Sequence, residues 1–83
     1  MIMDVGRVCR KVRGADSGQY CVVIERPRRK ADRNFVTIEG ERIKRQRVNI
    51  GHIEPLPVVL SISGEITREE IIEALKSNNF INT

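Results

Sequence analysis

The chain has 83 residues, of which 40% are hydrophobic and 31% are charged, and its formal net charge is +4. We expect this length to form a single domain over residues 1–83, which leaves little room for a catalytic cleft between two lobes. No apolar run approaches the roughly 18 residues that a membrane helix needs, and the N-terminal residues lack the basic and apolar stretches of a secretion signal. We therefore expect a cytosolic protein that binds no membrane.

The charge is distributed unevenly along the chain. Residues 1–55 carry 13 basic and 7 acidic side chains, a balance of +6, whereas residues 56–83 carry 2 basic and 4 acidic ones, a balance of −2. A basic surface attracts phosphates through the release of counterions, so the asymmetry predicts a polyanionic partner for the first part of the chain. Arginine outnumbers lysine by 11 to 4, which suits RNA because a guanidinium group binds phosphate with two hydrogen bonds and stacks on bases.

A β-hairpin is predicted at the start of the chain. Residues 6–12 predict a first strand, although Arg10 interrupts its apolar face. Residues 13–18 are turn formers, and Gly14 and Gly18 can take the positive φ angles that a tight, bulged loop demands. Residues 19–24 are mostly β-branched or aromatic, so they predict a second strand that is buried on both faces.

Three further strands and two basic segments follow. Residues 26–33 hold five basic side chains against one acidic one and show no apolar period, so we expect a loop there. Residues 42–47 are basic, and we expect most of them to be exposed. Residues 54–57 contain two prolines and predict an extended connector. The remaining strands are predicted at residues 34–38, 48–50 and 58–62.

The last part of the chain changes to a helical period. Thr67 and Glu70 match a capping box, and Ile66 and Ile71 lie where a hydrophobic staple packs. One helix is predicted from about residue 68 to 77, or about 67–78 with its caps, and Asn78 and Asn79 are its predicted terminators. Five short strands and one C-terminal helix predict a mainly β fold: a small, partly open barrel over about residues 5–62, with the helix covering one open end or face.

The residue types that carry catalysis or bind metals form no recognisable set. Cys9, Cys21 and His52 cannot supply a four-ligand zinc site, and Ser17 and Ser61 lack a neighbouring base. We expect His52 to be a turn residue bonded to the backbone, and we expect no enzyme activity, no cofactor and no metal. Cys9 and Cys21 are expected to be small buried residues on neighbouring strands; a disulfide is the alternative if they face each other across the hairpin.

Two segments resemble a known family. Residues 6–24 resemble a KOW motif, a strand–loop–strand unit with a fixed loop glycine that Gly18 matches. Residues 44–55, Lys-Arg-Gln-Arg-Val-Asn-Ile-Gly-His-Ile-Glu-Pro, resemble the second signature of ribosomal protein 14e of the large subunit, in its short archaeal form. The resemblance implies an SH3-like barrel bound to large-subunit ribosomal RNA. Arg10 departs from the pattern because an apolar residue is expected at its strand position.

The basic loops are the predicted RNA-binding site, by the footprint that clustered Lys and Arg leave in nucleic-acid-binding proteins. Gly14 and Gly18 are given a structural role in the first loop. Arg45 and Arg47 are expected to be exposed charges that contribute little to folding. The predicted RNA-binding residues are Lys11, Arg13, Arg28, Arg29, Lys30, Arg33, Arg42, Lys44, Arg45 and Arg47.

These observations predict a structural constituent of the large ribosomal subunit that supports translation. Rigid RNA helices and junctions, read through backbone shape, suit a surface with few aromatic rings. The expected partners are ribosomal RNA and neighbouring ribosomal proteins on cytoplasmic ribosomes, with no small-molecule substrate, and the protein is expected to be monomeric away from the ribosome. Two alternatives remain: a KOW-type transcription elongation or chromatin factor that binds RNA polymerase or duplex DNA, and a protein-binding barrel that uses an exposed strand edge.

Overall fold

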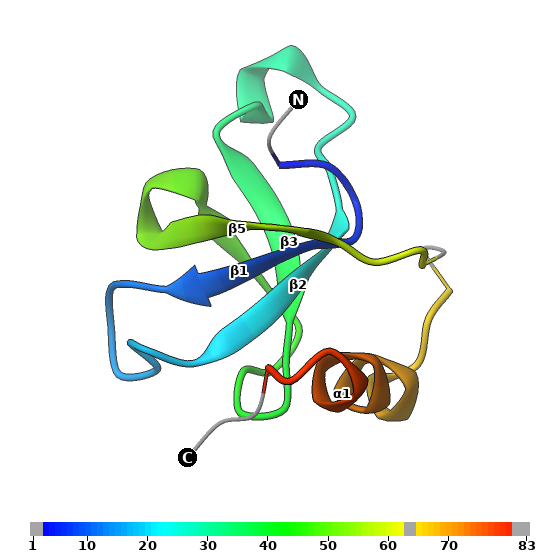
Figure 1. Cartoon of the computed structure of the whole chain (residues 1–83). Helices are drawn as coiled ribbons and strands as arrows, with labels where there is room; N and C mark the ends of the chain where they lie inside the picture. Colours follow the sequence, from blue (N-terminus) through cyan, green and yellow to red (C-terminus); the bar gives the residue numbers. More distant parts are fainter. Residues whose placement is uncertain (1–2, 63–64, 81–83) are drawn as a thin grey trace.

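Five antiparallel strands form one sheet, and an α-helix lies across one of its faces (Figure 1). The computed structural model describes residues 3–62 and 65–80. The strands follow the order β4-β3-β2-β1-β5 in the sheet. Two short 3₁₀ turns, η1 (Lys30–Asp32) and η2 (Ile50–His52), lie in the connections before β3 and β5. The bounds of the elements are β1 Arg7–Lys11, β2 Tyr20–Glu25, β3 Phe35–Glu39, β4 Gln46–Asn49, β5 Ile53–Val59 and α1 Arg68–Ser77.

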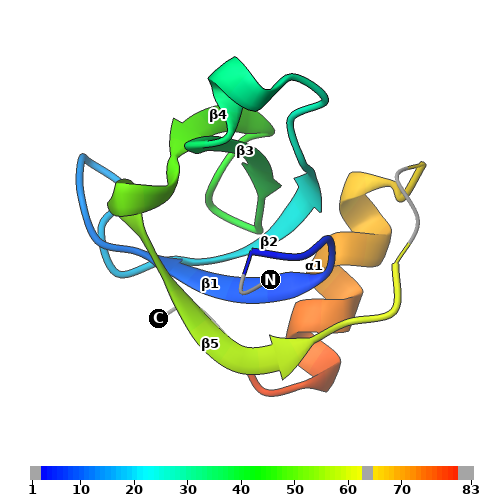
Figure 2. The ribbon, with the colours of Figure 1, turned by 90° about the horizontal axis from the view of Figure 1, so that it is seen from above.

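The sheet curls strongly but does not close. The pairing shifts between Arg7 and Cys9 along β1, and between Val23 and Glu25 along β2. Irregularities of this kind bend a strand and increase its twist. Seen from above, β3 and β4 curve over the inner face of β1 and β2, and η2 bridges β4 to β5 (Figure 2). The predicted mainly β fold, a partly open five-stranded barrel with one C-terminal helix, is therefore confirmed for the described residues.

Alternate residues of β2 enter two different cores. Cys21 and Val23 join the core inside the curled sheet, whereas Val22 and Ile24 join the core under the helix. All four are buried, so the predicted burial of this strand on both faces is confirmed. A chain of this size has little apolar surface to bury. Because both faces of β2 are buried, the side chains of this one strand contribute to both cores. The inner core also contains Met3, Cys9, Val36, Ile38, Ile43, Val48 and Ile53, and the outer core contains Val8, Ile66, Ile71 and Leu75.

The last strand begins earlier than the sequence predicts. Residues 54–57, predicted as a connector, belong to β5, which ends at Val59, so the expectation of a fifth strand at residues 58–62 is wrong at both ends. The prolines at 55 and 57 are tolerated because β5 lies at the edge of the sheet, where a missing N–H is least costly. Likewise, β4 begins at Gln46, two residues before the predicted strand.

The helix α1 has the predicted bounds and caps. The Thr67 hydroxyl accepts a hydrogen bond from the Glu70 amide, and the Glu70 carboxylate accepts one from the Thr67 amide, which completes the capping box. At the other end Asn79 takes a φ of 66°, and the Phe80 amide donates to the Leu75 carbonyl at 2.9 Å. This pattern closes a helix with a left-handed residue. No helix in the described part of the chain has the length and apolar character needed to cross a membrane.

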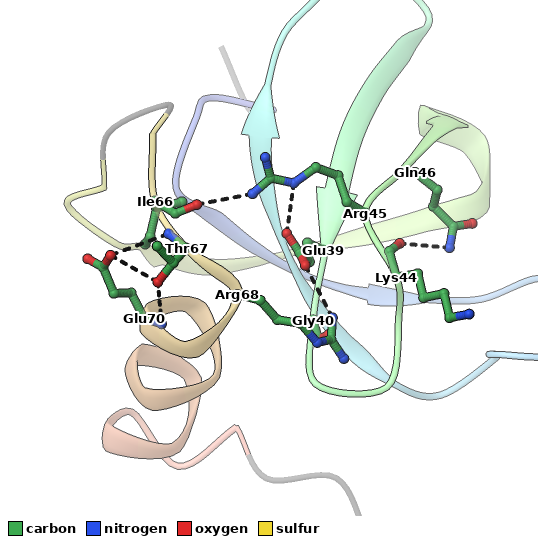
Figure 3. A network of polar contacts seen from close by, with 9 residues as sticks. All are labelled: Glu39, Gly40, Lys44, Arg45, Gln46, Ile66, Thr67, Arg68 and Glu70. Atoms are coloured by element: carbon green, nitrogen blue, oxygen red, sulfur yellow. Dashed lines mark hydrogen bonds and ion pairs between the residues drawn. The ribbon is translucent and has the colours of Figure 1, made fainter.

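A buried carboxylate joins the helix to the sheet (Figure 3). Glu39, at the end of β3, is only 5% exposed, and its two oxygens accept from Arg45 Nε at 2.8 Å and from Arg68 Nη1 at 3.2 Å. Arg45 also donates to the Ile66 carbonyl, and Arg68 donates to the Gly40 carbonyl. A cation in the first turn of a helix is normally unfavourable, so the position of Arg68 is explained by this carboxylate. We call Glu39, Arg45 and Arg68 the carboxylate clasp.

The clasp makes Arg45 a stabilising residue. Arg45→Ala should lower the free energy of unfolding by about 1–2 kcal/mol, because it leaves a buried carboxylate with one charged partner instead of two. Urea denaturation measures the change. The matched control is Lys44→Ala, since Lys44 is exposed, points away from Glu39 in Figure 3 and has no side-chain partner among the described residues; its effect should stay within about 0.5 kcal/mol. Equal effects of the two substitutions would contradict this role for Arg45.

Candidate nucleic-acid interface

The first hairpin loop, residues 12–19, presents one exposed cation. Gly14 and Gly18 take φ angles of 88° and 90°, which confirms the conformation predicted for these two glycines. Lys11 is only 9% exposed, and its Nζ lies 3.3 Å from Asp16 Oδ2 and 3.5 Å from Gln46 Oε1. Arg13 is exposed and has no side-chain partner among the described residues. Lys11 therefore ties the loop to β4, while Arg13 is the loop residue open to a ligand.

The second basic loop, residues 26–33, crosses the opposite end of β3 from the helix (teal, at the top of Figure 1). Its cations Arg28, Arg29, Lys30 and Arg33 are all exposed and have no ion-pair partner within the described residues. Together with Arg26 and Pro27 they line a hollow of about 170 Å³. So many unneutralised charges around one depression produce a strong positive potential.

Two larger hollows share a wall, and the first of them adjoins this loop. The first, of about 200 Å³, includes Arg28, Arg29 and Asp32 in its lining. The second, of about 380 Å³, lies between the first hairpin loop, β4 and η2, and includes Arg13 and His52. The residues lining both hollows are Phe35 and Arg47, which we call the shared wall.

The shared wall is a stacked pair of side chains. The guanidinium carbon of Arg47 lies 4.4 Å from the centre of the Phe35 ring, a cation–π contact. Arg47 Nη2 also lies 3.1 Å from Oδ1 of Asp32, the carboxylate of the second basic loop. Thr37 is paired with Arg47 between β3 and β4, which makes Phe35 the diagonal neighbour of Arg47 on the same face. The strand register therefore builds the stack.

The third group of predicted residues lies elsewhere. Arg42 and Lys44 are exposed on the turn between β3 and β4, which lies near the helix at the bottom of Figure 1. The second basic loop lies at the far end of the same strands. The structure thus brings Arg13, Arg28, Arg29 and Arg47 around the two hollows, keeps Lys30 and Arg33 beside them, and separates Arg42 and Lys44 from them.

Comparison with known proteins identifies the family. No family model matches the sequence. The chain is 39% identical over 77 residues to large ribosomal subunit protein eL14 of Staphylothermus marinus, an alignment that covers 88% of this chain and 76% of the relative. It is 38% identical to large ribosomal subunit protein eL14 of Hyperthermus butylicus, over 96% of this chain and 82% of the relative, and 33% identical to that of Metallosphaera sedula, over 98% and 84%. The chain belongs to the eL14 family.

The segment at residues 44–55, which resembles the second signature of ribosomal protein 14e, forms much of the second hollow. Residues 44–55 run from the β3–β4 turn through β4 and η2 into β5. Gln46, Arg47, Val48, Asn49 and His52 of this segment all line the second hollow. The Asn49 side chain accepts from the Gly51 amide at 2.8 Å and holds η2 in place.

Three basic residues of this eL14 family member form ion pairs with carboxylates inside the fold. Arg45 is exposed, as predicted, but its guanidinium is also bound by the buried Glu39 carboxylate, a contact that the sequence did not predict. Lys11 is buried at the base of its loop and paired with Asp16. Arg10, the departure from the KOW pattern, is exposed and lies 3.5 Å from Glu54 on the neighbouring β5, so it leaves the apolar core undisturbed.

Sequence reasoning missed the shared wall and the neutral side chains of the second hollow. Phe35 looked like an ordinary strand residue, and Asn49 looked like part of a strand motif. A usable signal was the position of Phe35 directly after the second basic loop, but its contact with Arg47 depends on strand register, which the sequence alone leaves open.

The two thiols of this eL14 family member are buried and face each other. Cys9 pairs with Cys21 in the register of β1 and β2, and both are free cysteines with no measurable exposure. The expectation of small buried residues on neighbouring strands is confirmed, and the disulfide alternative is not formed. Burial raises the pKa of Cys9 to about 12 and raises that of Cys21 as well. In the parts of the chain that the structure describes, no three His, Cys, Asp or Glu side chains are grouped as a metal ion would require.

The raised thiol pKa values predict a loss of stability in alkali. The folded state favours the neutral thiols, so their contribution is complete below about pH 8.5, the pKa of an unfolded thiol, and falls as the pH rises toward 12. The slope should be on the order of 1 kcal/mol per pH unit for each thiol. The measurement is the difference in free energy of unfolding between the wild type and Cys9→Ala/Cys21→Ala from pH 8 to 11. This difference should shrink steadily; a constant difference would show that the thiols ionise equally in both states.

Proposed function

We propose that the chain is a structural constituent of the large ribosomal subunit, with no catalytic role, and that it binds ribosomal RNA through its basic loops and thereby supports translation. The curated relatives are named as large-subunit ribosomal proteins over alignments that cover most of both chains. Further support comes from the surface around the shared wall, where Arg13, Arg28 and Arg29, which have no ion-pair partner within the described residues, line the adjoining hollows. We place the protein on cytoplasmic ribosomes, as one KOW-containing, SH3-like domain.

The observation that carries the RNA proposal is the grouping of arginines from three segments. Arg13 comes from the first hairpin loop, Arg28 and Arg29 from the second basic loop, and Arg47 from β4, yet all line two adjoining hollows. Phosphates are bound by such convergent guanidinium groups, with affinity that comes from charge rather than base sequence. Loops on a rigid sheet hold these groups in fixed positions, which suits the fixed shape of folded RNA.

The proposed contact residues divide by role. Arg13, Arg28, Arg29, Lys30, Arg33 and Arg47 form the main phosphate-binding face, and Arg42 and Lys44 form a separate contact near the helix. Lys11 and Arg45 support their own loops through Asp16 and Glu39. The exposed Glu69 and Glu73 of α1 would repel RNA, so we propose that the helix faces solvent or a neighbouring ribosomal protein.

Co-sedimentation with large ribosomal subunits tests the proposal. The full-length protein should sediment with subunits at low salt, and its affinity for ribosomal RNA should fall with salt at a log–log slope of about 0.7–0.9 per phosphate contacted. Arg28→Ala/Arg29→Ala should reduce that slope by about 1.5, because two phosphate contacts are lost.

The matched control removes two positive charges that the protein already neutralises. Arg10→Ala/Lys76→Ala eliminates the partners of Glu54 and Glu41, and should change the slope by much less. Failure of the wild type to sediment with large subunits at low salt would refute the proposed function. Equal slopes for the two double variants would remove the second basic loop from the interface.

A further inference from the structure

The shared wall holds a flat cationic group in a fixed orientation. The Phe35 ring supports one face of the Arg47 guanidinium at 4.4 Å, and Asp32 binds Nη2 at 3.1 Å. Because both contacts exist without a ligand, little side-chain freedom remains to be lost on binding. The Arg47 side chain is nevertheless 57% exposed, so a large part of it is open to a ligand.

We propose that the shared wall binds the base of one unpaired RNA nucleotide. This inference rests on the proposed RNA-binding function and adds a base-binding site to what would otherwise be a purely phosphate-binding surface. Bases that are splayed out of a helix stack on aromatic rings and on arginine planes. A Phe–Arg–base stack provides both the flat surface and the positive charge that such a base prefers.

The second hollow supplies polar groups beside the stack. Its volume of about 380 Å³ lies within the ~300–1,000 Å³ that small-molecule sites span. Asn49 uses its side-chain oxygen to hold the Gly51 amide, and its NH₂ group has no partner among the described residues. His52 lies in the turn η2, as predicted, but its side chain is exposed and makes no hydrogen bond within the described chain, so the expected bond to the backbone is not formed. These two groups can therefore bond to the edge of a base that lies against Arg47.

Positive charges flank the stack on both sides. Arg28 and Arg29 line the first hollow, and Arg13 lines the second, with Arg47 in the wall between them. The phosphates before and after a stacked nucleotide would thus each meet cations. Arg42 and Lys44 make no cation–π contact within the described residues and lie at the other end of β3 and β4, so they would bind phosphate but no base.

Three RNAs of matched length separate base binding from phosphate binding. The first is a fully paired duplex, the second is the same duplex with one bulged purine, and the third carries an abasic residue at the bulge, which keeps the extra phosphate but removes the base. Titration of the full-length protein with each RNA gives the dissociation constants. We expect the purine bulge to bind about tenfold tighter than the duplex and the abasic bulge, the size of effect that one base stack produces.

Two variants test which residues produce the preference for the purine bulge. Arg47→Lys keeps the charge but loses the flat group, so this variant should bind the purine bulge no more tightly than it binds the duplex and the abasic bulge. Arg42→Ala/Lys44→Ala should weaken the binding of all three RNAs by a similar factor and leave the preference intact. Circular dichroism confirms that each variant is folded.

The outcomes distinguish this inference from the function on which it rests. Salt-dependent binding of equal strength to all three RNAs would refute the base site and leave the phosphate-binding surface standing. A purine preference that survives in Arg47→Lys would also refute it. Absence of salt-dependent binding to every RNA, including ribosomal RNA, would instead refute the proposed function itself.

Discussion

The register between β3 and β4 is the constraint on which the rest of the molecule depends. Val36 pairs with Val48 and Thr37 with Arg47, so Val36, Ile38 and Val48 enter the inner core while Phe35, Thr37 and Arg47 share the outer face. On that outer face, the two ends of the strands hold two different pairs of side chains. Phe35 and Arg47 form the stack at one end, and Glu39 and Arg45 form part of the carboxylate clasp at the other. A slip of one residue would place the valines in solvent and separate both pairs.

The register of β3 and β4 explains why two neighbouring arginines, Arg45 and Arg47, have different contacts. Arg45 and Arg47 are two residues apart and lie on the same face, yet one is bound by a carboxylate that is 5% exposed and the other remains open beside two hollows. Arg45 and Arg68 both bind Glu39 of β3, and Arg45 also binds the Ile66 carbonyl just before the helix, so together they join the helix to the sheet. Arg47 remains accessible to a ligand because Phe35 and Asp32 hold it in place without burying it. A count of basic residues in the sequence does not distinguish Arg45 from Arg47, but the residues that each of them contacts do.

The sequence predicted the features that depend on neighbouring residues. The helix with its capping box, the two positive-φ glycines and the doubly buried β2 all follow from local pattern, and the structure confirms them. The extent of β5 was missed because its prolines suggest a connector until the strand is known to lie at an edge. The clasp was missed because Glu39 resembles a turn residue, and its partners lie 6 and 29 positions away. Contacts between distant residues require the register, which local patterns leave open.

Crosslinking in assembled large subunits tests the central claim most directly, because it reports which face of the protein touches RNA. Short-range protein–RNA crosslinks, mapped to amino acids by mass spectrometry, should concentrate in the second basic loop and around the second hollow, with a weaker group at residues 42–44. The outer face of α1, which carries Glu69 and Glu73, should give none. Crosslinks confined to that helix, with none from the loops beside the shared wall, would contradict the account.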